Sequence, residues 1–218
     1  MKTKKILIEL IELLDEFESE REVVGQEMNM SDFLGFLNSK NRSENIKTKQ
    51  LKGDYAGYKY EETDGPVTDI SILIVLMFRY AKGYIKKALR GSAIKTADEF
   101  SFLMTLMTYE SLSKSELIQK QVMEKTSGTE IINRMIKMGL IESFNDETDK
   151  RSVRVKMTPA GRMEIIKILP EMQKVSKIVT GNLNETEKNT MAYMLRKLEH
   201  YHNDIFMNKK DSELEELI

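Results

Sequence analysis

The chain has 218 residues, enough for one domain of ordinary size with an additional segment. It contains no cysteine and only two histidines, which excludes disulfides, thiol chemistry and thiolate zinc sites. The 34 basic and 35 acidic residues give a net charge of −1, so a polybasic protein is excluded although a local basic face is not. With 3 prolines and 11 glycines, the composition favours helices over an all-β or doubly wound α/β fold.

The first 65 residues combine an amphipathic helix, a short second helix that Ser31 can cap, and a polar segment at residues 38–65. Residues 4–24 place apolar side chains at helical spacing and glutamates on the opposite face. Glu9 and Glu12 interrupt the apolar stretch, which is therefore not a signal peptide. The most apolar run, residues 70–78, is far shorter than the roughly 20 residues that span a bilayer. We expect a cytoplasmic protein without membrane contact.

A long helix is predicted from Asp69 to near Gly91. Its first two turns are apolar on most of their circumference. Such a helix must be covered on several sides, which indicates a partner helix from a second subunit.

Three short helices follow, and their ends are marked by side chains. Thr-x-x-Glu at 96–99 is a capping box that begins a helix to about Tyr109, and Ser-x-x-Glu at 113–116 begins the next. The third helix begins around residues 125–127 and ends at Gly139, which suits a helix C-terminus. Two short helices joined by a turn of about four residues have the layout of a helix-turn-helix.

The third of these helices has two different faces. Its apolar face carries Ile131, Ile132, Met135 and Ile136, and the opposite face carries Thr126, Glu130, Asn133, Arg134 and Lys137. Hydroxyl, amide and guanidinium groups on one helix face can meet base edges in a major groove. An ordinary amphipathic surface helix has the same pattern, so this helix alone does not indicate DNA binding.

A β-hairpin is predicted directly after this helix. Residues 140–144 form a short strand candidate, residues 145–150 are polar, and residues 152–157 alternate strictly between apolar and other side chains. A hairpin in this position predicts a winged helix-turn-helix. Arg151 near the hairpin tip can enter a minor groove, and Asp149 can hold its guanidinium by a charge-assisted hydrogen bond.

The segment from 112 to 161 resembles the MarR family of bacterial regulators. The resemblance rests on Leu-Ser-Lys-Ser-Glu-Leu at 112–117, Asn-Arg-Met-Ile-Lys-Met-Gly-Leu-Ile-Glu at 133–142, Asp-Lys-Arg-Ser-Val at 149–153 and Met-Thr-Pro-Ala-Gly-Arg at 157–162. The wing pattern, Asp-x-Arg followed by an alternating strand and Met-Thr-x-x-Gly, is complete. The resemblance extends over about residues 66–208, while residues 1–65 have no counterpart.

The resemblance implies a mainly α fold with a small β wing and a helical dimerisation layer. Residues 66–95 and 160–208 are then dimerisation helices, including two helices at 160–180 and 184–207, and residues 96–159 are the winged helix-turn-helix. Residues 1–65 form a helical extension and linker, and residues 209–218 a polar tail.

The resemblance also implies a function. The family consists of homodimeric, sequence-specific double-stranded DNA-binding regulators, mostly repressors on near-palindromic operators. Many are released by small ligands, which implies a small aromatic or amphipathic ligand here. No cofactor or metal is expected. Carried over by position, the DNA-binding residues are Thr126, Ser127, Thr129, Asn133, Arg134, Asp149 and Arg151, with Lys114, Lys120, Lys125, Lys150 and Arg154 as phosphate candidates.

Several positions depart from the family pattern and keep an alternative open. Glu130 repels phosphate, Val122 stands where the turn often has glycine, and residues 113–158 carry only 9 basic against 7 acidic side chains. The alternative is an interaction module with weak or no DNA binding, whose residues 1–65 contact a protein partner. An enzyme is not expected, because the sequence has no phosphate loop, Gly-x-Ser-x-Gly or His-Glu-x-x-His motif.

Overall fold

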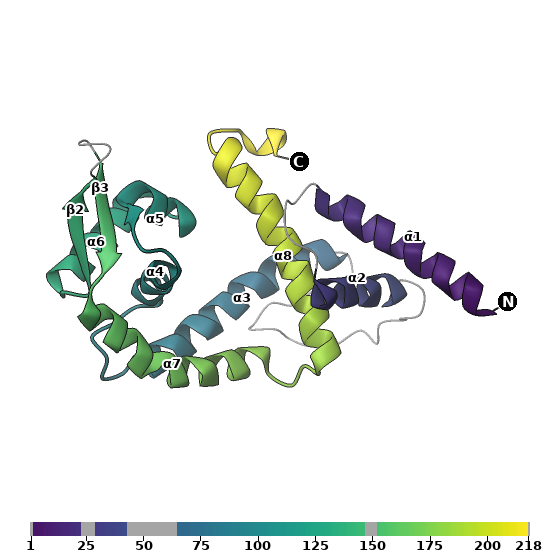
Figure 1. Cartoon of the computed structure of the whole chain (residues 1–218), viewed down its shortest axis with the longest axis horizontal. Coiled ribbons are helices and arrows are strands. Elements are labelled where there is room, and N and C mark those ends of the chain that lie inside the picture. Colours follow the sequence, from purple (N-terminus) through teal and green to yellow (C-terminus); the bar gives the residue numbers. More distant parts are fainter. Residues whose placement is uncertain (1, 23–28, 43–64, 147–151, 218) are drawn as a thin grey trace. The chain divides into compact units, whose positions relative to one another are not determined.

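The computed structural model describes residues 2–22, 29–42, 65–146 and 152–217 (Figure 1). The elements in chain order are α1 (Lys2–Glu22), α2 (Met30–Arg42), α3 (Gly65–Ala88), α4 (Ala97–Thr108), β1 (Leu112–Ser113), α5 (Lys114–Lys120), α6 (Lys125–Lys137), β2 (Ile141–Asn145), β3 (Val153–Met157), α7 (Pro159–Thr180), α8 (Glu185–Asn208) and the 3-10 helix η1 (Leu214–Glu216). The predicted fold class, mainly helical with a small β wing, is confirmed.

The chain divides into two compact units. Residues 60–181 form one, called here the reader unit, which contains α3 to α7 and the sheet. Residues 1–59 and 182–218 form the other, called here the terminal unit, which contains α1, α2 and α8. Helix α8 therefore belongs to the same unit as α1 and α2 of its own chain. The prediction that residues 66–208 form one MarR-like region, with α8 as a dimerisation helix, stays a prediction.

The terminal unit is held together by aromatic packing. Phe17 of α1, Phe36 of α2 and Tyr193 of α8 are buried together. Helices α2 and α8 approach so closely that a Cβ on Gly35 would lie 2.6 Å from the Tyr193 Cβ. The buried carboxylate of Asp32 also pairs with Arg196 of α8. The C-terminal half of α1 therefore packs on α2 and α8 of the same chain, whereas Ile11 and the apolar residues before it are exposed.

The reader unit has one hydrophobic core to which all its helices contribute. Leu103 of α4, Leu117 of α5, Ile132 of α6, Val155 of β3 and Ile165 of α7 are all fully buried in it. The C-terminal end of α3 packs against the same core through Ile85, and Leu89, directly after the helix, is buried in it. The flanking helices α3 and α7 are thus built into the domain that carries the helix-turn-helix.

The sheet has three antiparallel strands in the order β1-β3-β2. In the wing, the hairpin formed by β2 and β3, Ile141 pairs with Met157 and Asn145 with Val153. Leu112 of β1 pairs with Val155 on the other side of β3. Strand β1 was not predicted, because two residues are too few to show alternation. It joins the wing to the start of the helix-turn-helix.

Helix boundaries follow the predicted caps. Thr96 and Ser113 both form complete capping boxes, with Glu99 and Glu116 as the reciprocal acceptors. Helix α3 begins at Gly65 rather than at Asp69, because a proline at position 66 is tolerated in a first turn, where its missing N–H is not needed. Over the residues described, no helix combines the length and apolar character needed to cross a membrane.

Two carboxylates make the stability of the reader unit sensitive to acid. The Ala93 backbone N–H donates to Glu164 at 2.9 Å and, with Ser92 and Lys167, holds the pKa of Glu164 below its usual value. The Ser113 backbone N–H and hydroxyl do the same for the pKa of Glu116, helped by the charges of Arg154 and Lys120. Both carboxylates are stabilising when ionised.

We predict that this stabilisation is fully present above about pH 4.5 and is lost as the pH falls through the lowered folded-state values. Urea unfolding at pH 7, 5, 4 and 3.5 measures the free energy of unfolding. Glu164→Gln removes one titrating group, so the variant should start less stable and lose less stability on acidification. Parallel pH profiles for the two proteins would contradict the assignment.

Candidate DNA-binding site

Helix α6 presents the polar face that the sequence predicted for the recognition helix. Ile131, Ile132 and Met135 are buried in the core. The side chains of Thr126, Ser127, Asn133 and Arg134 are exposed on the helix, as is Glu130. Helix α6 and strand β2 pack together, so the wing stands beside this helix (Figure 1).

Helices α5 and α6 are in closest contact at Gly128. A Cβ on Gly128 would lie 2.5 Å from Cγ1 of Ile118, a buried side chain of α5. Only glycine therefore allows the two helices to pack this closely, which fixes α6 relative to α5. Gly128 lies within the first turns of α6, between the predicted contacts Ser127 and Thr129.

The remaining predicted contacts on the helix-turn-helix differ in what they touch. The Thr129 hydroxyl donates to the Lys125 carbonyl at 2.6 Å and is directed to its own helix. Lys120 donates to the Tyr109 hydroxyl at 3.0 Å and lies 4.5 Å above the centroid of that ring. Lys125 is exposed and Lys114 half-buried. The roles of all four residues in DNA binding stay predictions.

Arg134 reaches into the protein from the polar face of α6. Its Nε donates to Oε1 of Glu99 at 2.5 Å. The Glu99 side chain is fully buried, whereas the Arg134 side chain is 48% exposed. The predicted DNA contact is thus also one half of an ion pair between α6 and the start of α4.

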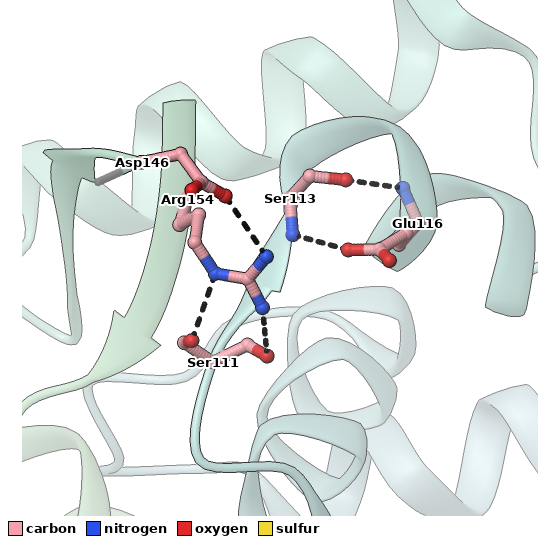
Figure 2. Close-up of polar contacts among 5 residues, drawn as sticks. All are labelled: Ser111, Ser113, Glu116, Asp146 and Arg154. Atoms are coloured by element: carbon pink, nitrogen blue, oxygen red, sulfur yellow. Dashed lines mark hydrogen bonds and ion pairs between the residues drawn. The ribbon is translucent and has the colours of Figure 1, made fainter. Parts of the chain in front are cut away.

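Arg154 holds the wing against the start of the helix-turn-helix (Figure 2). Its Nε donates to the Ser111 hydroxyl at 3.0 Å and its Nη2 to the Ser111 carbonyl at 2.9 Å. Its Nη1 donates to the Asp146 carboxylate at 3.2 Å. All three guanidinium nitrogens are engaged within the protein, so the structure gives Arg154 a structural task in addition to the predicted phosphate contact.

The predicted wing-tip contacts Asp149, Lys150 and Arg151 lie outside the described residues. The outermost described pair of the hairpin is Asp146 and Ser152, where the Asp146 backbone N–H donates to the Ser152 carbonyl at 3.0 Å.

The turn between α5 and α6 contains a backbone conformation that is costly for its residue. Val122 has φ of +51°, and among the described residues it is the only residue other than glycine with a positive φ. The left-handed region costs about 1–2 kcal/mol for a residue with a Cβ, and a β-branched side chain is especially unfavourable there. Glycine is the residue that suits this turn.

We predict that Val122→Gly stabilises the protein by about 0.5–1 kcal/mol. The relief of strain outweighs the larger chain entropy of glycine in the unfolded state, and little packing is lost because Val122 is 57% exposed. Thermal and urea unfolding measure the change. Val153→Gly, at an exposed strand position, is the control and should destabilise. A less stable Val122→Gly protein would show that the turn is not strained.

A surface hollow lies at the base of the wing. It encloses about 360 Å³ and is lined by Leu106, Met107, Thr108, Tyr109, Glu110, Lys156, Met157 and Arg162. These residues come from α4 and the segment after it, from β3 and from α7. The lining is more polar than apolar, and it carries two cationic side chains, Lys156 and Arg162, beside the carboxylate of Glu110.

Sequence reasoning missed Glu99 as a residue of this site. Its capping box was recognised, and that signal accounts for Oε2, which accepts from the backbone N–H groups of Lys95 and Thr96. The partner of Oε1, Arg134, lies 35 residues away, and nothing in the local sequence announces it.

Comparison with known proteins agrees with this geometry. Residues 96–161 match a family model described as a winged helix DNA-binding domain. The chain is 27% identical over 103 residues to the HTH-type transcriptional repressor NicR of Pseudomonas putida. The aligned region covers 47% of this chain and 65% of NicR, so the chain spans just under two thirds of the length of that relative.

Solved structures show the same fold. A mutant of Escherichia coli MarR in complex with operator DNA matches with a TM-score of 0.57 and 22% identity, over 61% of this chain and 94% of that one. Bordetella bronchiseptica BpsR, whose DNA binding is regulated by 6-hydroxynicotinic acid, matches with a TM-score of 0.56 and 22% identity, over 60% of this chain and 98% of that one. This chain therefore contains a winged helix DNA-binding domain at residues 96–161 and has a MarR-like fold.

Proposed function

We propose that the protein is a homodimeric, sequence-specific, cytoplasmic repressor that binds near-palindromic double-stranded DNA and is released by a small ligand. The observation that carries the proposal is the exposed polar face of α6 on a buried apolar back, with the wing beside it. Two recognition helices related by a two-fold axis meet successive major grooves about 34–36 Å apart.

The exposed surface of α3 supports a dimer. Ile70, Leu73, Ile74 and Phe78 are between 40% and 63% exposed in the single chain. They recur at the spacing of one helical face, and a contiguous apolar face of this kind marks a protein interface more often than a free surface. A second subunit is the occupant that the MarR-like fold favours.

The hollow at the base of the wing supports ligand control. Lys156 and Arg162 in its lining attract a carboxylate, against the opposing charge of Glu110, and Leu106, Met107 and Met157 offer apolar contact to an aromatic ring. A ligand there touches both the wing and α7, so it can alter the spacing of the DNA-binding parts. Titrating small aromatic carboxylates, 6-hydroxynicotinic acid among them, against the protein–DNA complex tests this part of the proposal.

We predict that the full chain selects a near-palindrome from a library of randomised DNA duplexes. Fluorescence anisotropy on the selected duplex and on a scrambled one, from about 50 to 200 mM salt, then measures affinity and its salt dependence. Arg151→Ala should cost about 1–3 kcal/mol on the selected duplex, because it removes the minor-groove contact. Its effect on the scrambled duplex should be smaller.

Selection of no sequence, with equally weak binding to all duplexes, would contradict the proposal and favour the interaction module. Glu130→Gln separates weak binding from its absence. Glu130 is exposed on the face predicted to meet DNA, so removing its charge should strengthen binding to both duplexes. A protein that does not bind DNA gains nothing from this change.

A further inference from the structure

The carboxylate of Glu99 is the one fully buried acid among the described residues of the reader unit. Burying an ionised carboxylate is unfavourable unless hydrogen bonds and a cation compensate it. Oε2 accepts from the backbone N–H groups of Lys95 and Thr96, at 2.6 and 3.2 Å. Oε1 accepts from Nε of Arg134, at 2.5 Å. Glu99 thus joins the N-terminus of α4 to the exposed face of α6.

The other end of Arg134 is available. A guanidinium has five N–H donors, and Nε carries only one of them. Within residues 65–146 and 152–217, no hydrogen bond engages the two terminal nitrogens of Arg134, and its side chain is about half exposed. The side chain is therefore anchored at one edge and open at the other.

We propose that Glu99 is a positioning residue that holds Arg134 by Nε so that its terminal nitrogens bind a DNA phosphate. This inference rests on the proposed function. An arginine on an exposed helix face normally loses rotamer freedom when it binds. The buried carboxylate removes most of that freedom in advance and fixes the plane of the guanidinium, which makes the contact directional rather than a diffuse attraction.

A double-mutant cycle tests the proposal on the selected duplex. Glu99→Gln keeps an oxygen that accepts from Lys95 and Thr96 but removes the charge that binds Arg134. We expect this variant to bind about tenfold or more weakly. Arg134→Ala should lose a similar factor, and its plot of log K against log salt should have a slope smaller by about 1. The double variant should bind no more weakly than Arg134→Ala alone.

The exposed pair of Glu171 and Lys174 on α7 provides the matched control. Its atoms are also 2.5 Å apart, but both side chains are about half exposed or more. The same cycle with Glu171→Gln and Lys174→Ala should change neither DNA affinity nor its salt dependence, nor measurably the melting temperature.

Arg134→Lys covers the case in which Glu99→Gln does not fold. It keeps the positive charge but has a single nitrogen in place of separate Nε and Nη groups. We expect it to bind the selected duplex at least about fivefold more weakly than the wild type. If Arg134→Lys binds the selected duplex as tightly as the wild type, the proposal is wrong. It is also wrong if the wild type binds DNA and the affinity losses of Glu99→Gln and Arg134→Ala add up in the double variant. A wild type that binds no duplex instead refutes the proposed function, and this inference with it.

Discussion

Replacing Gly161 by alanine should destabilise the protein by about 3 kcal/mol or more, the largest effect we expect from a single methyl group. A Cβ at this position would lie 2.1 Å from the Leu140 carbonyl oxygen and 3.1 Å from Cγ of Met157. Both the oxygen and the first turn of α7 are fixed, because the Thr158 backbone N–H donates to the same Leu140 carbonyl. The clash can be relieved only by moving backbone.

Gly83→Ala is the control for this prediction. Gly83 lies within α3, and no atom would come within 4 Å of its added Cβ. Alanine is the better helix former by about 0.5–1 kcal/mol, so this variant should be slightly more stable than the wild type. Urea unfolding of the two variants beside the wild type measures both effects. Equal stability of Gly161→Ala and the wild type would show that α7 does not approach Leu140 this closely.

Replacing Arg154 by alanine should have the second largest effect, a loss of about 2 kcal/mol together with loosening of the wing. The change removes hydrogen bonds to the hydroxyl and carbonyl of Ser111 and to the carboxylate of Asp146, whose side chain is 12% exposed. Hydrogen bonds that involve a charged and partly buried group contribute more than neutral surface ones. Amide hydrogen exchange should become faster in β2 and β3 than in α4.

Lys156→Ala is the matched control on the same strand. Lys156 pairs with Glu142 at 3.2 Å, but both side chains are about half exposed, so its loss should cost about 0.5 kcal/mol or less. Arg154→Lys should lose most of the stability that Arg154→Ala loses, because an ammonium cannot reproduce the fork on Ser111. Wild-type stability of Arg154→Lys would mean that charge alone holds the wing.

The helices and the wing could be predicted because their signals are local. Four helix starts are marked by a capping side chain that accepts a hydrogen bond from the backbone N–H three residues later. These capping residues are Thr96, Ser113, Thr158 and Asn184. The alternation at residues 152–157 likewise predicts β3. Its apolar position Val153 is nevertheless 38% exposed, because Val153 pairs with Asn145 at the outer end of the hairpin.

The partners of the two key arginines could not be predicted in this way. The sequence shows that Arg134 and Arg154 are charged and lie on polar faces, but it does not show which side chains they bind. Their acceptors, Glu99 and Ser111, are 35 and 43 residues away and come near only through packing of the core. The requirement for glycine at position 161 is similar, because the atom that excludes a Cβ belongs to the Leu140 backbone.

Helix α7 is rigidly attached to the helix-turn-helix through the shared hydrophobic core, so a rotation of α7 also moves α6. Ile165 and Ile168, near its start, belong to the same core as Ile132 of the recognition helix, so the two helices move as one body. At 1.5 Å per residue, 22 residues of straight helix span about 33 Å, and Pro170 inside α7 makes this an upper limit. A pivot of about 5° at its far end therefore displaces the near end by at most about 3 Å. In the proposed dimer the two displacements would add, so a small change in the angle of α7 would move both recognition helices out of register with successive major grooves.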